Sequence, residues 1–219
     1  MAMNKVYNIG DAINVVKDGD IVLMGGFLLS GYPKCLVEQL NKTKASNLTV
    51  VSSDTATTDS PTYELMKSGR VKKVYASYIG GNAETGRLYI TKEAEVELVP
   101  QGTLAERIRA AGAGLGGVLT PTGVGTIVEE GKDTLLIDGK KYLLEKPIKG
   151  NVALIKAWKG DSLGNLVLKG SARNFNEVMA TAADFVIAQV DELVEPGDID
   201  PEDVSIPSVF VDAVVKVGV

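Results

Sequence analysis

The sequence contains no histidine and a single cysteine among its 219 residues. Without histidine, the chain lacks the side chain that most often acts as a general base near neutral pH. Mechanisms that pair a serine or cysteine nucleophile with histidine would need the histidine from another chain. A zinc site would lack its usual histidine and cysteine ligands, so we expect no metal site. The lone Cys35 cannot form an internal disulfide, which favours a reducing compartment and predicts a cytoplasmic protein.

Long apolar runs and basic clusters are also missing. No run approaches the ~20 apolar residues of a membrane helix, and the N-terminus lacks a charged and then apolar signal pattern. The formal charge is −5 and the basic residues are scattered, so no basic stripe is available to hold a phosphate backbone. Membrane and nucleic-acid partners are therefore not expected. The length and ordinary globular composition predict one domain over residues 1–219.

Short apolar segments alternate with helical patterns along the chain. Residues 21–24 form an apolar run that ends at a glycine pair, and Pro33 opens a helical pattern. Further strands are predicted at 48–51, 73–79, 95–99, 152–158 and 185–190, and further helices near 63–67, from Thr103 through 109, and around 176–183; residues 210–216 close the domain. This alternation predicts an α/β fold with a mostly parallel open sheet and helices on both faces.

The middle of the chain interrupts that alternation. Residues 112–125 are rich in glycine and predict an irregular loop, and Asp138-Gly139 separates two short apolar runs, which predicts a small β-hairpin appendage. Residues 112–117 match Gly-x-Gly-x-x-Gly, but they follow a predicted helix where a dinucleotide fingerprint follows a strand. We interpret them as a flexible or ligand-shaping loop, with NAD only a weak alternative.

One continuous pattern runs from Asp18 to Pro33: Asp-Gly, two residues, three apolar positions, then Gly-Gly-Phe-x-x-x-Gly-x-Pro. Glycines let a backbone approach a bulky ligand, and the helix that follows offers N-terminal NH groups. A plain strand–turn–helix connection would look similar, so the physics alone leaves both interpretations open. The loop at issue consists of Gly25, Gly26, Phe27, Leu28, Leu29, Ser30 and Gly31, and we name it the glycine loop.

This pattern resembles the signature of family I coenzyme A (CoA) transferases. The resemblance covers nearly the whole chain. Within the family, the sequence is most similar to the α subunits that act on acetate, butyrate or acetoacetate. The resemblance is carried by five further blocks, at residues 76–80, 100–109, 119–126, 172–176 and 194–197. It implies that the glycine loop binds CoA, that acyl-CoA is a substrate with no permanently bound cofactor, and that a β subunit completes an α2β2 or larger heteromer.

The resemblance also implies how the work is divided between subunits. In this family a glutamate of a Glu-Asn-Gly motif on the β subunit attacks the thioester, and no such motif occurs here. Gln101, in Pro-Gln-Gly-Thr-Leu, is implied to be an oxyanion donor; a helix-start glutamine that bonds its own backbone is the plainer interpretation. We expect Arg107 and Arg109 on a solvated helix surface, and Trp158 and Phe175 in the core.

Two other functions fit the same segments. A sugar-phosphate isomerase or a ligand-sensing module could bind phosphate at the glycine loop without a partner, because fold does not fix function. A purely structural subunit is the third possibility. It predicts that Gln101→Ala leaves the rate of the assembled enzyme nearly intact, whereas the enzymatic hypothesis predicts a large loss.

Overall fold

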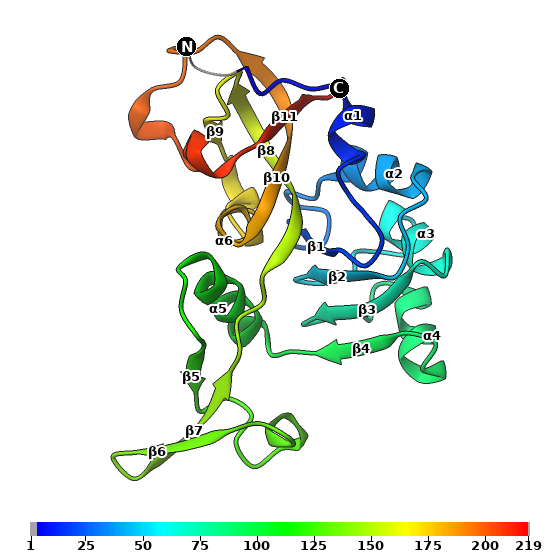
Figure 1. Ribbon diagram of the computed structural model, residues 1–219, viewed down its shortest axis with the longest axis vertical. Coiled ribbons are helices and arrows are strands. Elements are labelled where there is room, and N and C mark those ends of the chain that lie inside the picture. The colour runs from blue at the N-terminus through cyan, green and yellow to red at the C-terminus, as the bar shows by residue number, and fades with distance from the viewer. Residues whose placement is uncertain (1–3, 219) are drawn as a thin grey trace.

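The main sheet of the computed structural model, which describes residues 4–218, has eight strands in the order β11-β10-β8-β1-β2-β3-β4, with β9 paired to β8 (Figure 1). All neighbours are parallel except β9 and β8. The strands are β1 (Ile21–Met24), β2 (Leu48–Ser52), β3 (Val71–Ala76), β4 (Glu95–Leu98), β8 (Gly150–Asp161), β9 (Leu166–Val167), β10 (Ala183–Val194) and β11 (Ala213–Lys216). The predicted mostly parallel open sheet is confirmed.

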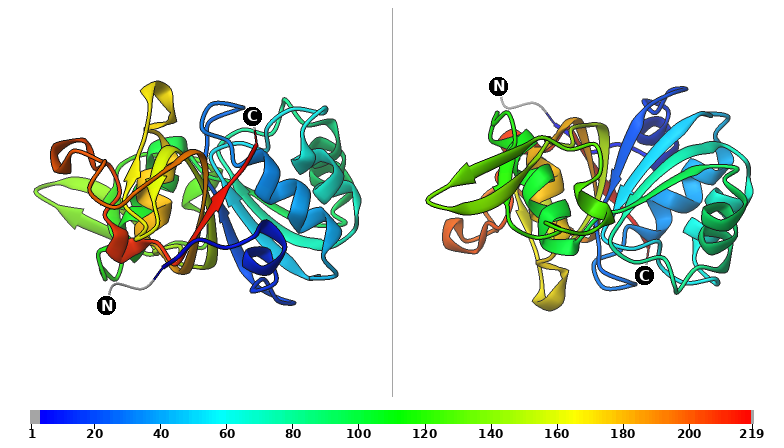
Figure 2. Two further views of the ribbon diagram at one scale, coloured as in Figure 1. Left: turned by 90° about the horizontal axis from the view of Figure 1, so that it is seen from above. Right: turned by 90° about the horizontal axis from the view of Figure 1, so that it is seen from below.

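Helices cover both faces of this sheet, as predicted (Figure 2). Side chains alternate along a strand, so Val22 and Met24 pack into one core while Leu23 packs into the other. The first core includes side chains of α1 (Ile9–Ile13), α2 (Lys34–Lys42), α3 (Pro61–Lys67) and α4 (Ala83–Thr91). The second includes side chains of α5 (Gln101–Gly112) and α6 (Phe175–Thr181).

A separate three-stranded antiparallel sheet projects from the body below α5 in Figure 1. It contains β5 (Val118–Thr120), β6 (Thr134–Ile137) and β7 (Lys140–Glu145). The predicted hairpin is confirmed: Asp138 and Gly139 both have positive φ, 49° and 76°, as a two-residue hairpin turn requires. The predicted irregular loop is wrong in part, because β5 pairs with β7 inside the glycine-rich segment.

Several helix boundaries also differ from prediction. Helix α4 was not anticipated from the sequence, and α5 begins at Gln101 rather than at Thr103. Thr103 does not cap the helix; it is buried within it, and its hydroxyl has no hydrogen-bond partner among the described residues. Residue 183 belongs to β10 rather than to the preceding helix. Short 3₁₀ helices complete the chain: η1 (Ile127–Glu129), η2 (Gly170–Ala172), η3 (Pro201–Asp203) and η4 (Ser208–Phe210).

The strand order reverses at β1. The chain moves outward in one direction through β2, β3 and β4, then returns to the other side of β1 with β8 and moves outward again through β10 and β11. In open α/β sheets a ligand crevice lies outside the carboxyl ends of the strands at such a switch point. The glycine loop follows β1 directly, so the fold places it at the switch.

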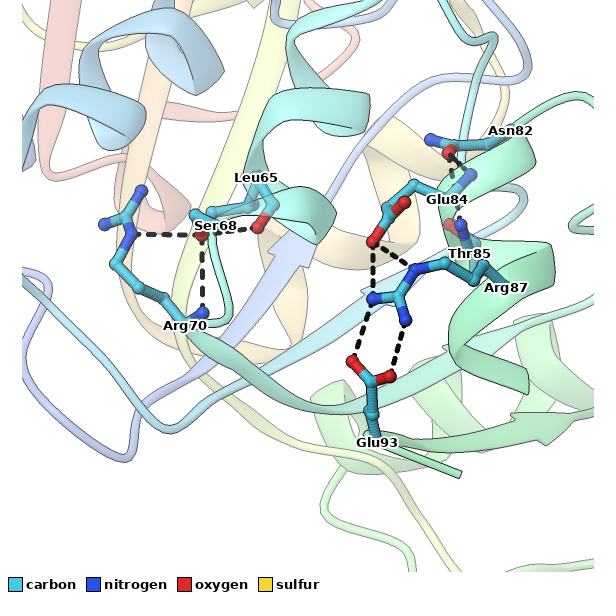
Figure 3. Close-up of polar contacts among 8 residues, drawn as sticks. All are labelled: Leu65, Ser68, Arg70, Asn82, Glu84, Thr85, Arg87 and Glu93. Carbon is cyan, nitrogen blue, oxygen red and sulfur yellow. Dashed lines mark hydrogen bonds and ion pairs between the residues drawn. The ribbon is translucent and has the colours of Figure 1, made fainter. Parts of the chain in front are cut away.

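Two arginines hold the outer helices through several hydrogen bonds each (Figure 3). Arg87 of α4 bonds the carboxylates of Glu84, in the same helix, and Glu93, which precedes β4. Arg70, just before β3, donates to Ser68 Oγ and to four backbone carbonyls at and beyond the end of α2, those of Leu40, Asn41, Thr43 and Ala45. The Arg70 guanidinium therefore donates to carbonyls of the segment that leaves α2, of which Leu40 O also accepts the Thr43 N–H and hydroxyl.

We predict that Arg70→Ala lowers the free energy of unfolding by about 2 kcal/mol, because bonds from a charged donor to these carbonyls are lost. Arg70→Lys should recover only part of this, since an ammonium cannot reproduce the planar fork. Urea unfolding of both variants measures the effect. Arg109→Ala is the control, because Arg109 is half exposed and paired only within its own helix turn. Equal losses at Arg70 and Arg109 would contradict the prediction.

Candidate functional site at the carboxyl edge

Four neighbouring parallel strands, β1 to β4, end at one edge of the main sheet, which we name the carboxyl edge. The glycine loop follows β1, Ser53 and Asp54 follow β2, Tyr78 lies beyond β3, and Gln101 lies three residues beyond the end of β4. An isolated bridge joins Asp54 to Tyr78, and Ser77 N donates to Ser53 O at 2.8 Å. The edge therefore brings together groups from four separate stretches of sequence.

The glycine loop contains a tight turn. Phe27 and Ser30 exchange two backbone hydrogen bonds of 3.0 Å, which leaves Leu28 and Leu29 at the tip. Leu28 has φ +50°, a left-handed conformation that costs energy for a residue with a side chain. Phe27, Leu28 and Leu29 are 40 to 56% exposed as whole residues, so the turn presents an apolar surface outside the sheet.

Asp54 holds the tip of this turn in place. One carboxylate oxygen accepts the Leu28 N–H at 2.8 Å, and the other accepts the Ala56 N–H at 2.9 Å. Asp54 is itself buried, and bonds from backbone N–H groups stabilise a buried carboxylate. One oxygen of Asp54 thus fixes the strained Leu28, and the other fixes the backbone at Ala56.

Three glycines of the loop lie so close to neighbouring atoms that a Cβ would clash with them. A Cβ on Gly25 would lie 1.9 Å from Asn176 Oδ1, and one on Gly31 would lie 2.7 Å from Asn176 Nδ2. Gly26 has φ +105° and its Cβ would meet the Tyr32 backbone at 2.9 Å. The loop therefore fits around Asn176 on one side and Tyr32 on the other.

Asn176, on α6, is the fully buried partner of the loop. Its amide nitrogen donates to Gly31 O at 3.1 Å and to Ala172 O at 3.0 Å, and its oxygen accepts the Lys156 N–H at 3.0 Å. These bonds connect the loop, η2 and β8 through one side chain. Asn176 fixes the shape of the loop at the switch point.

Gln101 begins α5 with its side chain exposed at the carboxyl edge. Its Nε2 makes a long hydrogen bond of 3.4 Å to Ser53 Oγ, and the N-cap Pro100 supplies no side-chain cap for the helix start. The plainer interpretation of Gln101 as a residue bonding its own backbone is not what the structure shows. Instead, a primary amide and a helix N-terminus face the same edge as the glycine loop.

Tyr32 directly follows the glycine loop, and its side chain is buried in the core. Its hydroxyl lies 2.7 Å from Thr62 Oγ1 of α3, and both residues are buried. Burial raises the pKa of the Tyr32 hydroxyl well above its ordinary range, because the phenolate would be poorly solvated. A phenol with a raised folded-state pKa stabilises the fold fully below the ordinary pKa of ~10 and loses that contribution as the pH rises above it.

We predict that wild-type protein loses up to ~1.4 kcal/mol of unfolding free energy per pH unit above pH ~10 through Tyr32. Tyr32→Phe should be less stable at neutral pH, since Thr62 loses its partner, but should show a shallower alkaline decline. Urea unfolding at several alkaline pH values measures the slope. Tyr7→Phe, at an exposed tyrosine, should keep the wild-type slope; identical slopes for all three proteins would contradict the prediction.

The structure tests the predictions made for four further side chains. Arg107 is buried rather than solvated: it bonds Glu97 Oε1 at 3.1 Å and Lys146 O at 2.8 Å, and Glu145 lies 3.7 Å away. Arg107 therefore connects α5 to β4 and to the end of β7, and its guanidinium serves the fold rather than a ligand. Arg109 is exposed and pairs with Glu106, as expected. Of the two aromatics, Phe175 is buried as predicted, whereas Trp158 is only half-buried.

Among residues 4–218, no group of three or more Cys, Asp or Glu side chains is arranged to hold a metal ion. Within the same residues, no helix is long and apolar enough to cross a membrane. The segment matching Gly-x-Gly-x-x-Gly starts at the last residue of α5 and leads into β5, the reverse of the order needed to bind a dinucleotide phosphate.

The sheet order defines an open α/β protein, and the glycine loop and Gln101 lie at the carboxyl edge around its switch point. Comparison with known proteins identifies the family. The family model "Coenzyme A transferase" matches residues 6–217. The chain is 49% identical to acetate CoA-transferase subunit alpha of Escherichia coli K12, covering 96% of each chain. It is 44% identical to the acetoacetyl-CoA:acetate/butyrate CoA transferase alpha subunit of Clostridium acetobutylicum, covering 97% of this chain and 98% of that one.

Solved structures share the fold. An acyl-CoA transferase from E. coli O157:H7, in a thioester complex with CoA, superposes with a TM-score of 0.89 at 24% identity. This chain is covered to 99% in that comparison and spans 48% of the other chain. Glutaconate coenzyme A-transferase from Acidaminococcus fermentans gives a TM-score of 0.85 at 21% identity, covering 98% of this chain and 76% of the other.

The chain belongs to the coenzyme A transferase family, which confirms the resemblance seen in the sequence. The alternative of a sugar-phosphate isomerase or ligand-sensing module receives no support, because the curated relatives are named as CoA-transferase subunits.

Proposed function

We propose that this chain is the α subunit of a heteromeric enzyme that exchanges CoA between short-chain acyl-CoA and carboxylic acids of the acetate, butyrate and acetoacetate class. The names of the E. coli and C. acetobutylicum relatives support this substrate class. In the proposal residues 1–219 act as one domain, and a β subunit completes an α2β2 or larger assembly. We place the reaction in the cytoplasm, where a single unpaired cysteine suits a reducing environment.

One observation carries the proposal: the carboxyl edge gathers a ligand loop and a neutral hydrogen-bond donor beside a carboxylate that is already engaged. Both oxygens of Asp54 accept backbone N–H groups, so Asp54 is unsuited to attack a thioester. Gln101 can donate but cannot act as a nucleophile or base. Neither Asp54 nor Gln101 therefore suits the role of the attacking group, which agrees with a nucleophilic glutamate on the partner subunit.

The proposed reaction relays the acyl group through that glutamate. Its carboxylate attacks the thioester carbonyl, the C–S bond breaks, and CoA leaves as a thiolate with formation of an acyl-glutamyl anhydride. The thiolate then attacks the glutamyl carbonyl and releases the first acid as a carboxylate, leaving a glutamyl-CoA thioester. The acceptor acid repeats these steps in reverse, so neither ATP nor an oxidant is consumed.

Each step passes through a tetrahedral oxyanion. In the proposal the Gln101 amide donates a hydrogen bond to this oxygen, and the N-terminus of α5 adds a favourable dipole. A neutral amide suits this role because it stays a donor at every pH at which the enzyme works. The long bond to Ser53 leaves Gln101 able to reorient towards a ligand.

The glycine loop is the proposed CoA site on this chain, formed by Gly25, Gly26, Phe27, Leu28, Leu29, Ser30 and Gly31. Its exposed apolar tip offers a surface for the pantetheine arm, and glycines allow the close approach. Burial of that tip against CoA and the partner subunit would also exclude water from the reactive anhydride.

The test is to purify this chain alone and with its co-expressed partner, and to assay acyl-CoA:carboxylate exchange. We expect activity only from the assembly, and a CoA adduct located by mass spectrometry on a partner glutamate. Activity of this chain alone, or an adduct on one of its own glutamates, would refute the two-subunit proposal.

A further inference from the structure

Trp158 is the only tryptophan of the chain, and it occupies an unusual position. Strand β8 continues past Leu154, where its pairing with β1 ends, and Trp158 lies in that extension. It is half-buried although its neighbours Ala157 and Gly160 are buried. The ring therefore lies on the far side of the switch point from Gln101, with part of its surface open.

Two ammonium groups lie close to this ring. The Nζ atoms of Lys159 and Lys169 each lie 4.5 Å from the ring centroid. Lys159 is also 3.4 Å from a half-exposed Glu192 carboxylate, but among residues 4–218 no carboxylate lies within ion-pair distance of Lys169. One uncompensated cation thus sits over an aromatic face, in a chain whose net charge is −5.

This lysine–tryptophan cluster (Trp158, Lys159 and Lys169) is connected to the glycine loop. Lys169 is the N-cap residue of η2, and the hydroxyl of Ser171 in η2 lies 2.6 Å from that of Ser30. Asn174, just beyond η2, donates to Ser30 O at 3.1 Å. Lys169 is thus two residues from a direct contact with the glycine loop.

We propose that the lysine–tryptophan cluster is a phosphate subsite that binds the phosphate groups on the nucleotide half of CoA. The inference rests on the proposed function. Two ammonium groups held by one rigid ring match a multiply charged phosphate, whereas the apolar tip of the glycine loop matches the uncharged pantetheine arm. The two halves of CoA would then be recognised by two different surfaces on either side of Ser30.

Truncated substrates test this in the assembled enzyme. Lys169→Gln should raise KM for acyl-CoA about 10-fold, the loss of one charge-assisted bond, and leave kcat nearly unchanged. KM for the same acyl group on pantetheine, which carries no phosphate, should not change. Lys92→Gln is the matched control, because Lys92 lies 4.4 Å from the Tyr89 ring at the end of α4. Equal effects on both substrates would overturn the subsite.

Fluorescence gives a readout that does not depend on catalysis. Titration of the assembly with adenosine 3′,5′-bisphosphate should change the emission of Trp158, and the change should be absent in Trp158→Phe and shifted about 10-fold in Lys169→Gln. No response, or the same response to inorganic phosphate at equal concentration, would overturn the assignment to CoA. If wild-type enzyme lacks transferase activity but the titration succeeds, the proposed function fails and the phosphate subsite stands.

Discussion

Gln101→Ala is expected to lower kcat of the assembled enzyme by about 10²–10³-fold with little change in KM for acyl-CoA. The amide is proposed to donate to an oxyanion that exists only in the transition state, so its removal should leave substrate binding largely intact. Among residues 4–218 the only hydrogen bond of the Gln101 side chain is the long contact to Ser53, so the fold should tolerate the change. Steady-state kinetics on the purified heteromer measure the effect.

The control for this variant is Gln39→Ala, a glutamine on α2 away from the carboxyl edge. It should retain the wild-type kcat, and both variants should show the wild-type urea midpoint and still co-purify with the partner. A kcat within about threefold of wild type for Gln101→Ala would favour the purely structural subunit, since a lost oxyanion donor costs much more than that.

The features that sequence reasoning found are those encoded locally. The apolar run ending at Gly25 predicts β1 and its loop, because strand, turn and helix follow one another directly along the chain. Asp138-Gly139 likewise predicts its hairpin, since the turn needs two residues that tolerate positive φ. The predicted start of α5 was two residues too late. Thr103 and Glu106 match the sequence pattern of a capping box, but in the structure Thr103 is buried inside the helix.

The features that it missed depend on contacts between distant segments. Asp54 holds Leu28 across 26 positions, and Asn176 holds Gly31 across 145. For Ser53 and Asp54 a signal did exist, because polar residues directly after an apolar strand lie at the carboxyl edge of a parallel sheet. Nothing local marks Arg107 as buried: its carboxylate partners come from β4 and β7, and only the fold brings them together.

Alanine at Gly25 should lower the stability of the fold, for a steric reason. Gly25 is not among the glycines with positive φ, so its backbone would accept a side chain; the obstacle is the 1.9 Å approach of its Cβ to Asn176 Oδ1. We expect Gly25→Ala to lower unfolding free energy by ~1–3 kcal/mol and to raise KM for acyl-CoA, because the loop or Asn176 must move. Gly86→Ala in α4, where a Cβ meets nothing within 4 Å, should not destabilise the protein.

A double-mutant cycle separates this overlap from general damage. Asn176→Ala alone should cost ~1–3 kcal/mol, because Gly31 O, Ala172 O and Lys156 N lose their partner. It also removes the atom that Gly25→Ala would strike, so the double variant should be more stable than the sum of the two losses by ~1–2 kcal/mol. Urea unfolding of the four proteins gives this coupling. Additive losses would show that Asn176 does not set the shape of the glycine loop.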